Sequence, residues 1–173
     1  TLMNGTIHAE SKLNQGSQFI IELPLERTRL SEPVPEQGGT GELPVYLLGR
    51  RILLAEDNEI NLEIVTELLS GLGFAVDGAA NGAEAVERFK SSSSGYYSII
   101  LMDIQMPVMN GLEAADAIRR SDHADAGSIP IIALSANAFE EDVEKSLAHG
   151  MQAHISKPID MNTLKKLFVK YIR

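Results

Sequence analysis

Reactive side chains recur in this chain directly after short apolar runs. Glu56 and Asp57 follow the first such run, Asp103 follows a later one, and Ser135 and Lys157 each end another. The carboxyl ends of parallel strands meet at one edge of a sheet, where open α/β folds bind their ligands. We therefore expect these side chains to gather at a single site.

Three carboxylates at one site require a compensating positive charge. Two such charges 4 Å apart repel by about 4 kcal/mol at an effective dielectric near 20. A hard divalent cation such as Mg²⁺, or Mn²⁺ in its place, binds carboxylates together with water and phosphate oxygens. Asp103, ionised at neutral pH, can attack phosphorus, while Lys157 and Ser135 stabilise phosphoryl oxygens. The set predicts metal-dependent phosphoryl transfer to a carboxylate.

Each of these residues also has an ordinary structural explanation. Asp103 alone could cap a turn, Ser135 could cap a helix, and Lys157 could be a surface lysine. The acid pair could be a solvated turn. Their joint occurrence at successive strand ends favours a shared chemical role.

The elements that must position these groups alternate regularly from residue 51 onward. Apolar runs predict strands at 52–55, 75–78, 99–102, 129–134 and 153–156, each followed by a helical pattern. The first helix is expected to bury one stripe of apolar side chains, namely Ile60, Ile64, Val65, Leu68 and Leu72. The pattern predicts an α/β fold: a doubly wound, flavodoxin-like, five-stranded parallel sheet of order 2-1-3-4-5 with helices on both faces.

The first part of the chain has a different organisation. Residues 1–25 predict a short hairpin, with strands at Thr6–Glu10 and Ser17–Leu23. Residues 26–49 are rich in glycine and proline and are interpreted as a linker, in which Val45–Leu48 is apolar enough to dock on the next domain. A chain that begins near Gly49 is expected to fold as the 50–173 domain.

Composition excludes several classes of function. The hydrophobic fraction of 44% suits a packed core, and the net charge of −9 argues against a nucleic-acid surface. No apolar run approaches the roughly 20 residues of a membrane span, so we expect no membrane contact by these residues. Without cysteine, neither disulfides nor thiolate metal sites can form, which favours the cytoplasm. A membrane anchor upstream of residue 1 stays open.

Residues 50–173 resemble the receiver domain of two-component response regulators. The similarity lies in Leu54-Ala-Glu-Asp-Asn-Glu-Ile-Asn61, in Ile100-Leu-Met-Asp-Ile-Gln-Met-Pro-Val-Met-Asn-Gly111, in Pro130-Ile-Ile-Ala-Leu-Ser-Ala136 and in Ser156-Lys157-Pro158. The resemblance implies that Asp103 receives the phosphoryl group and that Ser135 and Lys157 assist it. It further implies that Asp57, Asp103 and the backbone carbonyl of Gln105 ligate Mg²⁺, with Glu56 acting through water.

The resemblance also assigns residues to switching and tuning. In that family the hydroxyl at the position of Ser135 moves on phosphorylation and is called the switch hydroxyl; Ala136 and Asn137 follow it. Gln105 and Asn137 are expected to tune hydrolysis of the phosphorylated state. Receivers usually carry Tyr or Phe where this chain has His154. We expect the ring to swing inward as a neutral imidazole on phosphorylation. The alternative is a solvated ring that takes no part in the switch.

The hairpin resembles the last two strands of a histidine-kinase ATPase domain. The match lies in Met3-Asn-Gly-Thr-Ile7 and Gly16-Ser-Gln-Phe19. Together the two similarities suggest the C-terminal part of a hybrid histidine kinase, whose partners would be the cognate kinase core and a histidine-phosphotransfer domain. These residues lack the ATP-binding and phosphoacceptor-histidine motifs, so we expect no ATP binding and leave open whether they are enzymatic.

Three other classes of protein fit these residues less well. A phosphatase of the haloacid-dehalogenase type needs a second Asp two residues after its nucleophile, where this chain has Gln105. A receiver-like module that is never phosphorylated would not need the complete set of acids, hydroxyl and lysine. A Rossmann nucleotide site is disfavoured because Gly71-Leu-Gly73 ends a helix and does not follow the first strand.

Overall fold

The computed structural model describes residues 5–12, 16–22, 24, 43–136 and 139–172. The chain divides into two compact units, Thr1–Gly41 and Glu42–Arg173, which are described separately. Most of the predicted linker, and Asn137, lie outside the described residues.

A five-stranded parallel sheet forms the centre of the larger unit. Its strands are β3 (Arg51–Ala55), β4 (Ala75–Ala79), β5 (Ile99–Asp103), β6 (Ile131–Ser135) and β7 (Ala153–Ser156). They are ordered β4-β3-β5-β6-β7, and every neighbouring pair is parallel. This is the predicted order, so the doubly wound fold is confirmed, with β3 and β5 adjacent where the strand order reverses.

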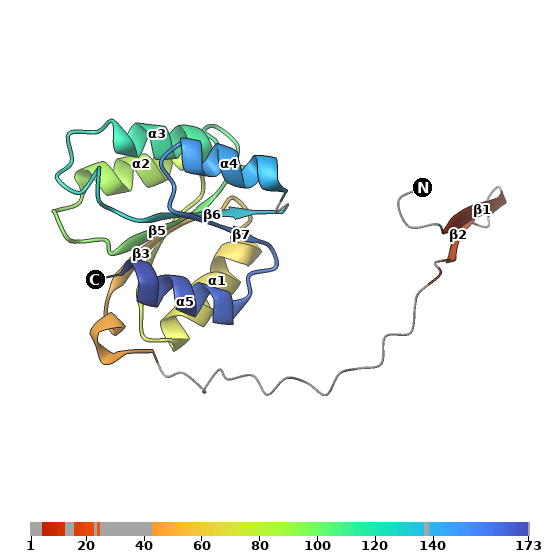
Figure 1. Cartoon of the computed structure of the whole chain (residues 1–173), viewed down its shortest axis with the longest axis horizontal. Coiled ribbons are helices and arrows are strands. Elements are labelled where there is room, and N and C mark those ends of the chain that lie inside the picture. The colour runs from red at the N-terminus through yellow and green to blue at the C-terminus, as the bar shows by residue number, and fades with distance from the viewer. Residues whose placement is uncertain (1–4, 13–15, 23, 25–42, 137–138, 173) are drawn as a thin grey trace. The chain divides into compact units, whose positions relative to one another are not determined.

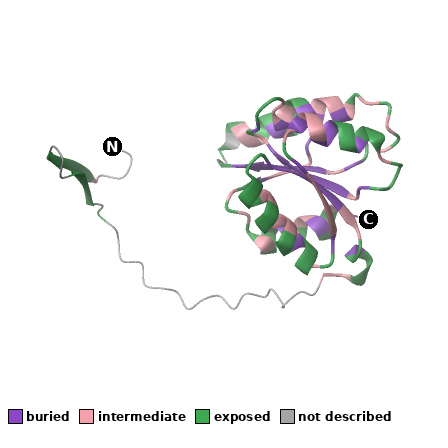
Figure 2. Cartoon of the chain, turned by 180° about the vertical axis from the view of Figure 1, so that it is seen from behind, coloured by how far each residue is buried: buried purple, intermediate pink, exposed green. Residues whose placement is uncertain are grey.

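Helices cover both faces of the sheet. They are α1 (Glu59–Gly71), α2 (Gly82–Ser91), α3 (Gly111–Arg119), α4 (Glu140–Ala148) and α5 (Met161–Tyr171). Helices α1 and α5 lie on one face, and α2, α3 and α4 on the other (Figure 1). Side chains alternate along β5, so Ile99 and Leu101 join the α1–α5 core while Ile100 and Met102 join the other. Both faces of the central strands β3, β5 and β6 are therefore buried (Figure 2).

The predicted buried stripe of α1 is wrong in most of its members. Ile60, Ile64 and Leu68 are 68%, 52% and 48% exposed. The helix instead turns Leu62, Val65, Leu69 and Leu72 toward the core. Helix α1 carries apolar residues at more positions than one face can bury, and packing on the sheet selects one of its two stripes.

The segment before β3 belongs to the larger unit. A short 3-10 helix, Val45–Leu47, precedes the strand, and the Leu47 side chain is fully buried among core residues. The Gly49 amide donates to the Gly73 carbonyl at 2.7 Å. The predicted docking of this segment is thus seen at Leu47, whereas Val45 is 81% exposed.

The smaller unit contains an antiparallel hairpin of β1 (Thr6–Lys12) and β2 (Gly16–Glu22). Ile7 pairs with Ile21, and Ala9 pairs with Phe19. Ile7, Phe19 and Ile21 are each more than 60% exposed. An isolated hairpin with an uncovered apolar face is marginally stable in water. Within the described part of the chain, no helix has the length and apolar character required to span a membrane.

Candidate phosphoacceptor site

The acid pair sits in the turn between β3 and α1. Glu56 is 2% exposed, and its backbone N–H donates to the Ala79 carbonyl at 3.0 Å, which continues the pairing with β4. Asn58 then caps α1, because its Oδ1 accepts from the backbone N–H groups of Ile60 and Asn61. Strand pairing and the helix cap together fix the turn that carries Glu56 and Asp57.

Asp103 is the last residue of β5 and is 5% exposed. The loop that follows folds back on it so closely that a Cβ at Gly111 would lie 2.2 Å from the Asp103 carbonyl oxygen. Only glycine fits there. Asn110 and Glu113 then form a reciprocal capping box at the start of α3. The glycine and the cap hold the loop against the strand end.

Lys157 connects the acids to the far strands of the sheet. Its Nζ donates to Glu56 Oε2 at 2.5 Å and to Asp103 Oδ2 at 2.6 Å. Its backbone N–H donates to the Ser135 carbonyl at 2.7 Å, which ties the end of β7 to the end of β6. The Lys157–Pro158 peptide bond is cis. The structure thus brings Glu56, Asp103 and Lys157 into direct contact.

The three carboxylates form one cluster that suits a hard cation. One oxygen from each of Glu56, Asp57 and Asp103 lies within 4.8 Å of the others. Asp57 is exposed, whereas the other two are buried. Mg²⁺ binds carboxylate oxygens and usually keeps several water ligands. A carboxylate cluster that is buried on one side and open to solvent on the other therefore suits it. The residues present therefore fit the predicted metal.

Burial and charge act in opposite directions on the ionisable groups. Burial raises the pKa of Asp103 above its ordinary range, against the lowering effect of the Lys157 and Gln105 hydrogen bonds. For Lys157, burial lowers the pKa, but its hydrogen bonds to Asp103 and Glu56 outweigh that effect and raise it. The ammonium therefore stays charged while it serves two carboxylates.

The remaining predicted residues differ in how closely they approach this site. The Gln105 backbone N–H donates to Asp103 Oδ1 at 3.1 Å, so this peptide lies beside the predicted acceptor. Ala136 is an exposed residue in the bend after β6. The half-buried His154 ring contacts Ser135, with 2.6 Å between Nε2 and Oγ. Whether His154 takes part in the switch stays a prediction.

Three residues near the site were missed by sequence reasoning. The side-chain amide of Asn61 donates to Glu56 Oε1 at 3.0 Å. Ser146 contacts His154 from α4. Val108 has a φ of 68° in the loop after Asp103, which is unusual for a β-branched residue. Asn61 could have been found from its place in the first turn of α1, but the other two carry no signal in sequence.

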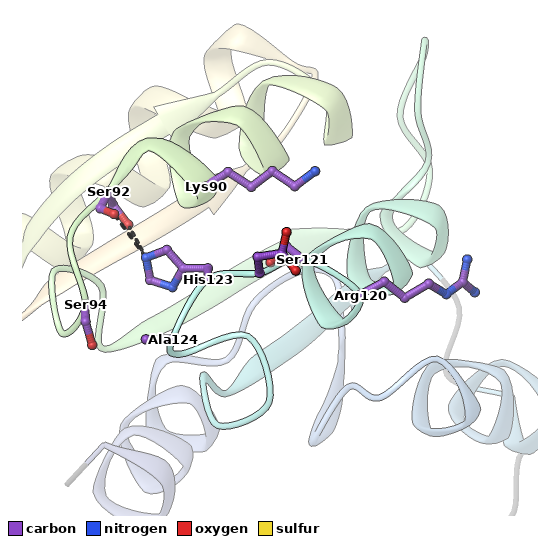
Figure 3. A pocket seen from close by; sticks show the side chains of 8 residues that line it. Lys90, Ser92, Ser94, Arg120, Ser121, His123 and Ala124 are labelled. Carbon is purple, nitrogen blue, oxygen red and sulfur yellow. Dashed lines mark hydrogen bonds between the residues drawn. The ribbon is translucent and has the colours of Figure 1, made fainter.

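A polar cavity of about 550 Å³ lies elsewhere, near the C-terminal ends of α2 and α3. It is lined by Lys90, Ser92, Ser94, Arg120, Ser121, Asp122, His123 and Ala124 (Figure 3). His123 Nε2 lies 3.0 Å from the Ser92 carbonyl oxygen, and its Nδ1 accepts from the Asp125 backbone N–H at 3.1 Å. Both ring nitrogens thus contact backbone atoms, which is a structural role.

Comparison with known proteins gives consistent matches. Residues 52–169 match the family model described as the response regulator receiver domain. The chain is 38% identical over 137 residues to hybrid signal transduction histidine kinase I of Dictyostelium discoideum. This alignment covers 78% of this chain and 8% of that protein. It is 39% identical over 141 residues to two-component system protein A of Emericella nidulans. That alignment covers 80% of this chain and 20% of that protein. The chain thus spans a small part of these relatives.

Solved receiver structures show the same fold. A receiver domain of a sensor histidine kinase from Pseudomonas aeruginosa, crystallised with magnesium in its active-site cleft, is 35% identical with a TM-score of 0.63, covering 71% of this chain and 97% of that one. A Saccharomyces cerevisiae receiver domain, crystallised with a histidine phosphotransfer protein, is 31% identical with a TM-score of 0.63, covering 72% of this chain and 90% of that one.

Proposed function

Because the chain belongs to the response regulator receiver domain family, we propose that Asp103 accepts a phosphoryl group from a phosphohistidine in a Mg²⁺-dependent reaction. The observation that supports this most directly is the contact of one lysine with two buried carboxylates, beside a third, exposed carboxylate. Such a cluster is short of positive charge in the resting state, and a bound Mg²⁺ would supply it.

The reaction transfers a phosphoryl group between two nucleophiles. A carboxylate oxygen of Asp103 attacks phosphorus, an O–P bond forms, and the N–P bond of the donor breaks. The electron pair of that bond returns to the donor imidazole, and the product is an acyl phosphate. Bound Mg²⁺, held by Asp57, Asp103 and the Gln105 carbonyl with Glu56 acting through water, would neutralise charge on the phosphoryl oxygens.

The protein groups have separate roles in this proposal. Lys157 already donates to Asp103 Oδ2 and can turn the same ammonium toward a phosphoryl oxygen. Ser135 supplies a hydroxyl from the neighbouring strand β6, whose residue Leu134 pairs with Asp103. The Gln105 N–H keeps the Asp103 carboxylate oriented. Gln105 and Asn137 would limit attack by water on the acyl phosphate, and Ala136 would move with the switch loop.

Intact mass after incubation with acetyl phosphate tests the proposal. We expect one hydroxylamine-labile phosphoryl adduct with Mg²⁺, and none with excess chelator. Asp103→Asn is the matched variant, since the amide keeps the shape and removes the nucleophile. Equal labelling of Asp103→Asn, or labelling that survives the chelator, contradicts the mechanism. No labelling at all under any condition would favour a receiver-like module that is not phosphorylated.

A phosphohistidine protein, namely the kinase core or a histidine-phosphotransfer domain, is the proposed donor or recipient. The exposed residues Ile60, Ile64 and Leu68 form a stripe on α1, the helix that begins just after the acid pair. Such a stripe beside the site suits an apolar partner surface. The yeast receiver crystallised with a phosphotransfer protein gives a precedent for this class of partner.

We further propose that residues 1–25 are the last hairpin of a kinase ATPase domain, joined by a linker to the receiver at 50–173. The exposed apolar face of the hairpin supports this, because it suits packing against the rest of a larger domain. A longer chain extended upstream should protect the amides of residues 6–12 and 16–22 from hydrogen exchange. Equal exchange in the long and short chains would contradict it.

The proposed compartment is the cytoplasm, with any membrane anchor upstream of residue 1. The absence of cysteine from the whole sequence is compatible with that compartment. Fractionation of cells that express the full-length protein tests the proposal, with an accessible tag after residue 173 expected on the cytoplasmic side.

A further inference from the structure

Two serines hold the His154 ring from opposite sides. Ser135 Oγ on β6 lies 2.6 Å from His154 Nε2, and Ser146 Oγ on α4 lies 3.1 Å from His154 Nδ1. Ser146 is fully buried. Ser146 can determine which ring nitrogen of His154 carries a proton. The ring in turn determines which way the hydrogen bond with Ser135 is donated.

The direction of these hydrogen bonds follows from the Ser146 hydroxyl. It donates its single proton to the Asp142 carbonyl oxygen, one turn earlier in α4, at 2.8 Å. Ser146 Oγ can therefore act toward His154 only as an acceptor, and Nδ1 must carry the proton. A ring that carries this one proton has its lone pair on Nε2. The contact at that nitrogen is accordingly donated by the Ser135 hydroxyl.

We propose that Ser146 is a positioning residue, which fixes the tautomer of His154 and thereby directs the Ser135 hydroxyl proton toward the imidazole in the unphosphorylated chain. This rests on the proposed function, in which Ser135 donates that same proton to a phosphoryl group on Asp103. Phosphorylation must then break the Ser135–His154 hydrogen bond. The relay from Ser146 through His154 thus stabilises the resting state.

Removal of the Ser146 hydroxyl should weaken that restraint. In Ser146→Ala the ring is free to adopt the Nε2–H tautomer, which donates to Ser135 Oγ and leaves the Ser135 proton for the phosphoryl site. We expect the variant to bind a phosphoryl mimic, beryllofluoride with Mg²⁺, about three- to tenfold more tightly than the parent, the range that one net hydrogen bond produces.

The matched control is Ser121→Ala. Ser121 Oγ donates to the Ile118 carbonyl at 2.7 Å, which is the same kind of bond to a preceding helical carbonyl, and it lies at the end of α3. The second control is the pair His154→Ala and Ser146→Ala/His154→Ala. If Ser146 acts through the ring, its removal has no further effect when the ring is absent.

Two measurements on the full chain decide the matter. Long-range ¹H–¹⁵N spectra report the tautomer of His154, and calorimetric titration reports affinity for beryllofluoride. We expect Nδ1–H in the parent, a shift toward Nε2–H in Ser146→Ala, and tighter mimic binding in Ser146→Ala but not in Ser121→Ala. An Nε2–H tautomer in the parent overturns the inference without any variant. Parent-like mimic affinity in Ser146→Ala overturns it as well, whereas a parent that binds no mimic overturns the proposed function too.

Discussion

Asp103 is a buried carboxylate whose charge is not fully compensated. Lys157 donates to it, but the same ammonium also donates to Glu56, and Asp57 lies in the same cluster. Burial raises the pKa of Asp103, so the folded chain holds a proton there more tightly than an unfolded chain does. Its favourable contribution to stability is present below the ordinary carboxyl pKa and is lost as pH rises through the raised one. At neutral pH the ionised group is therefore destabilising.

Asp103→Asn should consequently stabilise the metal-free chain at pH 7. The amide oxygen can still accept from Lys157, while one buried negative charge is gone. We expect a gain of about 1 kcal/mol, within the usual range for single substitutions. Added Mg²⁺ should raise the melting temperature of the parent and change that of the variant much less, because ligands stabilise only what they bind. Thermal melts in chelator and in Mg²⁺ measure both effects; a variant less stable than the parent in chelator would contradict the argument.

The Gln105 side chain should affect the lifetime of the phosphorylated state more than it affects the affinity for Mg²⁺. Its predicted metal ligand is a backbone carbonyl, which any side chain leaves in place, whereas its side chain is exposed and follows a backbone N–H that contacts Asp103. We expect Gln105→Ala to change the rate of dephosphorylation several-fold and the Mg²⁺ affinity by less than twofold, roughly within the small effects of surface changes. Decay of the phosphorylated mass and a Mg²⁺ titration test this, and identical decay in the two proteins would exclude the role.

Sequence reasoning found the acids and the lysine because each ends a strand, and parallel strands bring their ends to one edge. It missed Ser146 because the contact with His154 joins two elements whose packing angle no local pattern encodes. Asn61 sits within the quoted acidic motif, yet only the Asn58 cap fixes the turn that aims it at Glu56.

At the level of elements, strands were more predictable than helix faces. The central strands β3, β5 and β6 are short, apolar runs buried on both sides, so no choice of face was needed. Helix α1 required a choice, since apolar residues occupy two stripes. No local pattern in the sequence tells which stripe packs on β4 and β3. The stripe left exposed is the one that borders the site.

Ile64→Glu should therefore impair exchange with a protein partner and leave the chemistry intact. Ile64 lies in the middle of the exposed stripe. A charge placed in an apolar interface is costly, so we expect transfer from a phosphorylated phosphotransfer protein to slow by about tenfold or more. Labelling by acetyl phosphate should be unchanged. Leu147→Glu is the control, because Leu147 is similarly exposed on α4, which covers the other face of the sheet (Figure 1). Equal slowing by both substitutions would exclude α1 as the docking surface.

At the level of the whole molecule, composition and packing divide the chain at different residues. The glycine- and proline-rich stretch predicted a linker up to Gly49, but the compact unit begins at Glu42. A single side chain, Leu47, explains most of the difference. It lies with Ile52, Phe74 and Leu69 in the core under α1 and α5, within a segment in which Val45, Tyr46 and Leu48 are exposed and Leu43 is only partly buried. Composition averages over such a segment and does not detect one buried residue.

A chain that begins at Gly49 should therefore be less stable than one that begins at Glu42, although both should fold and bind Mg²⁺. Truncation at Gly49 removes a fully buried leucine and exposes the surfaces it covered, which costs about 2–5 kcal/mol by analogy with large-to-small core substitutions. Leu47→Ala in the longer chain should reproduce most of the loss. Val45→Ala is the matched control, because Val45 is 81% exposed and its truncation should cost less than about 0.5 kcal/mol. Urea unfolding of the four proteins gives the comparison; equal stability of the chains starting at Glu42 and Gly49 would show that Leu47 adds nothing to the receiver core.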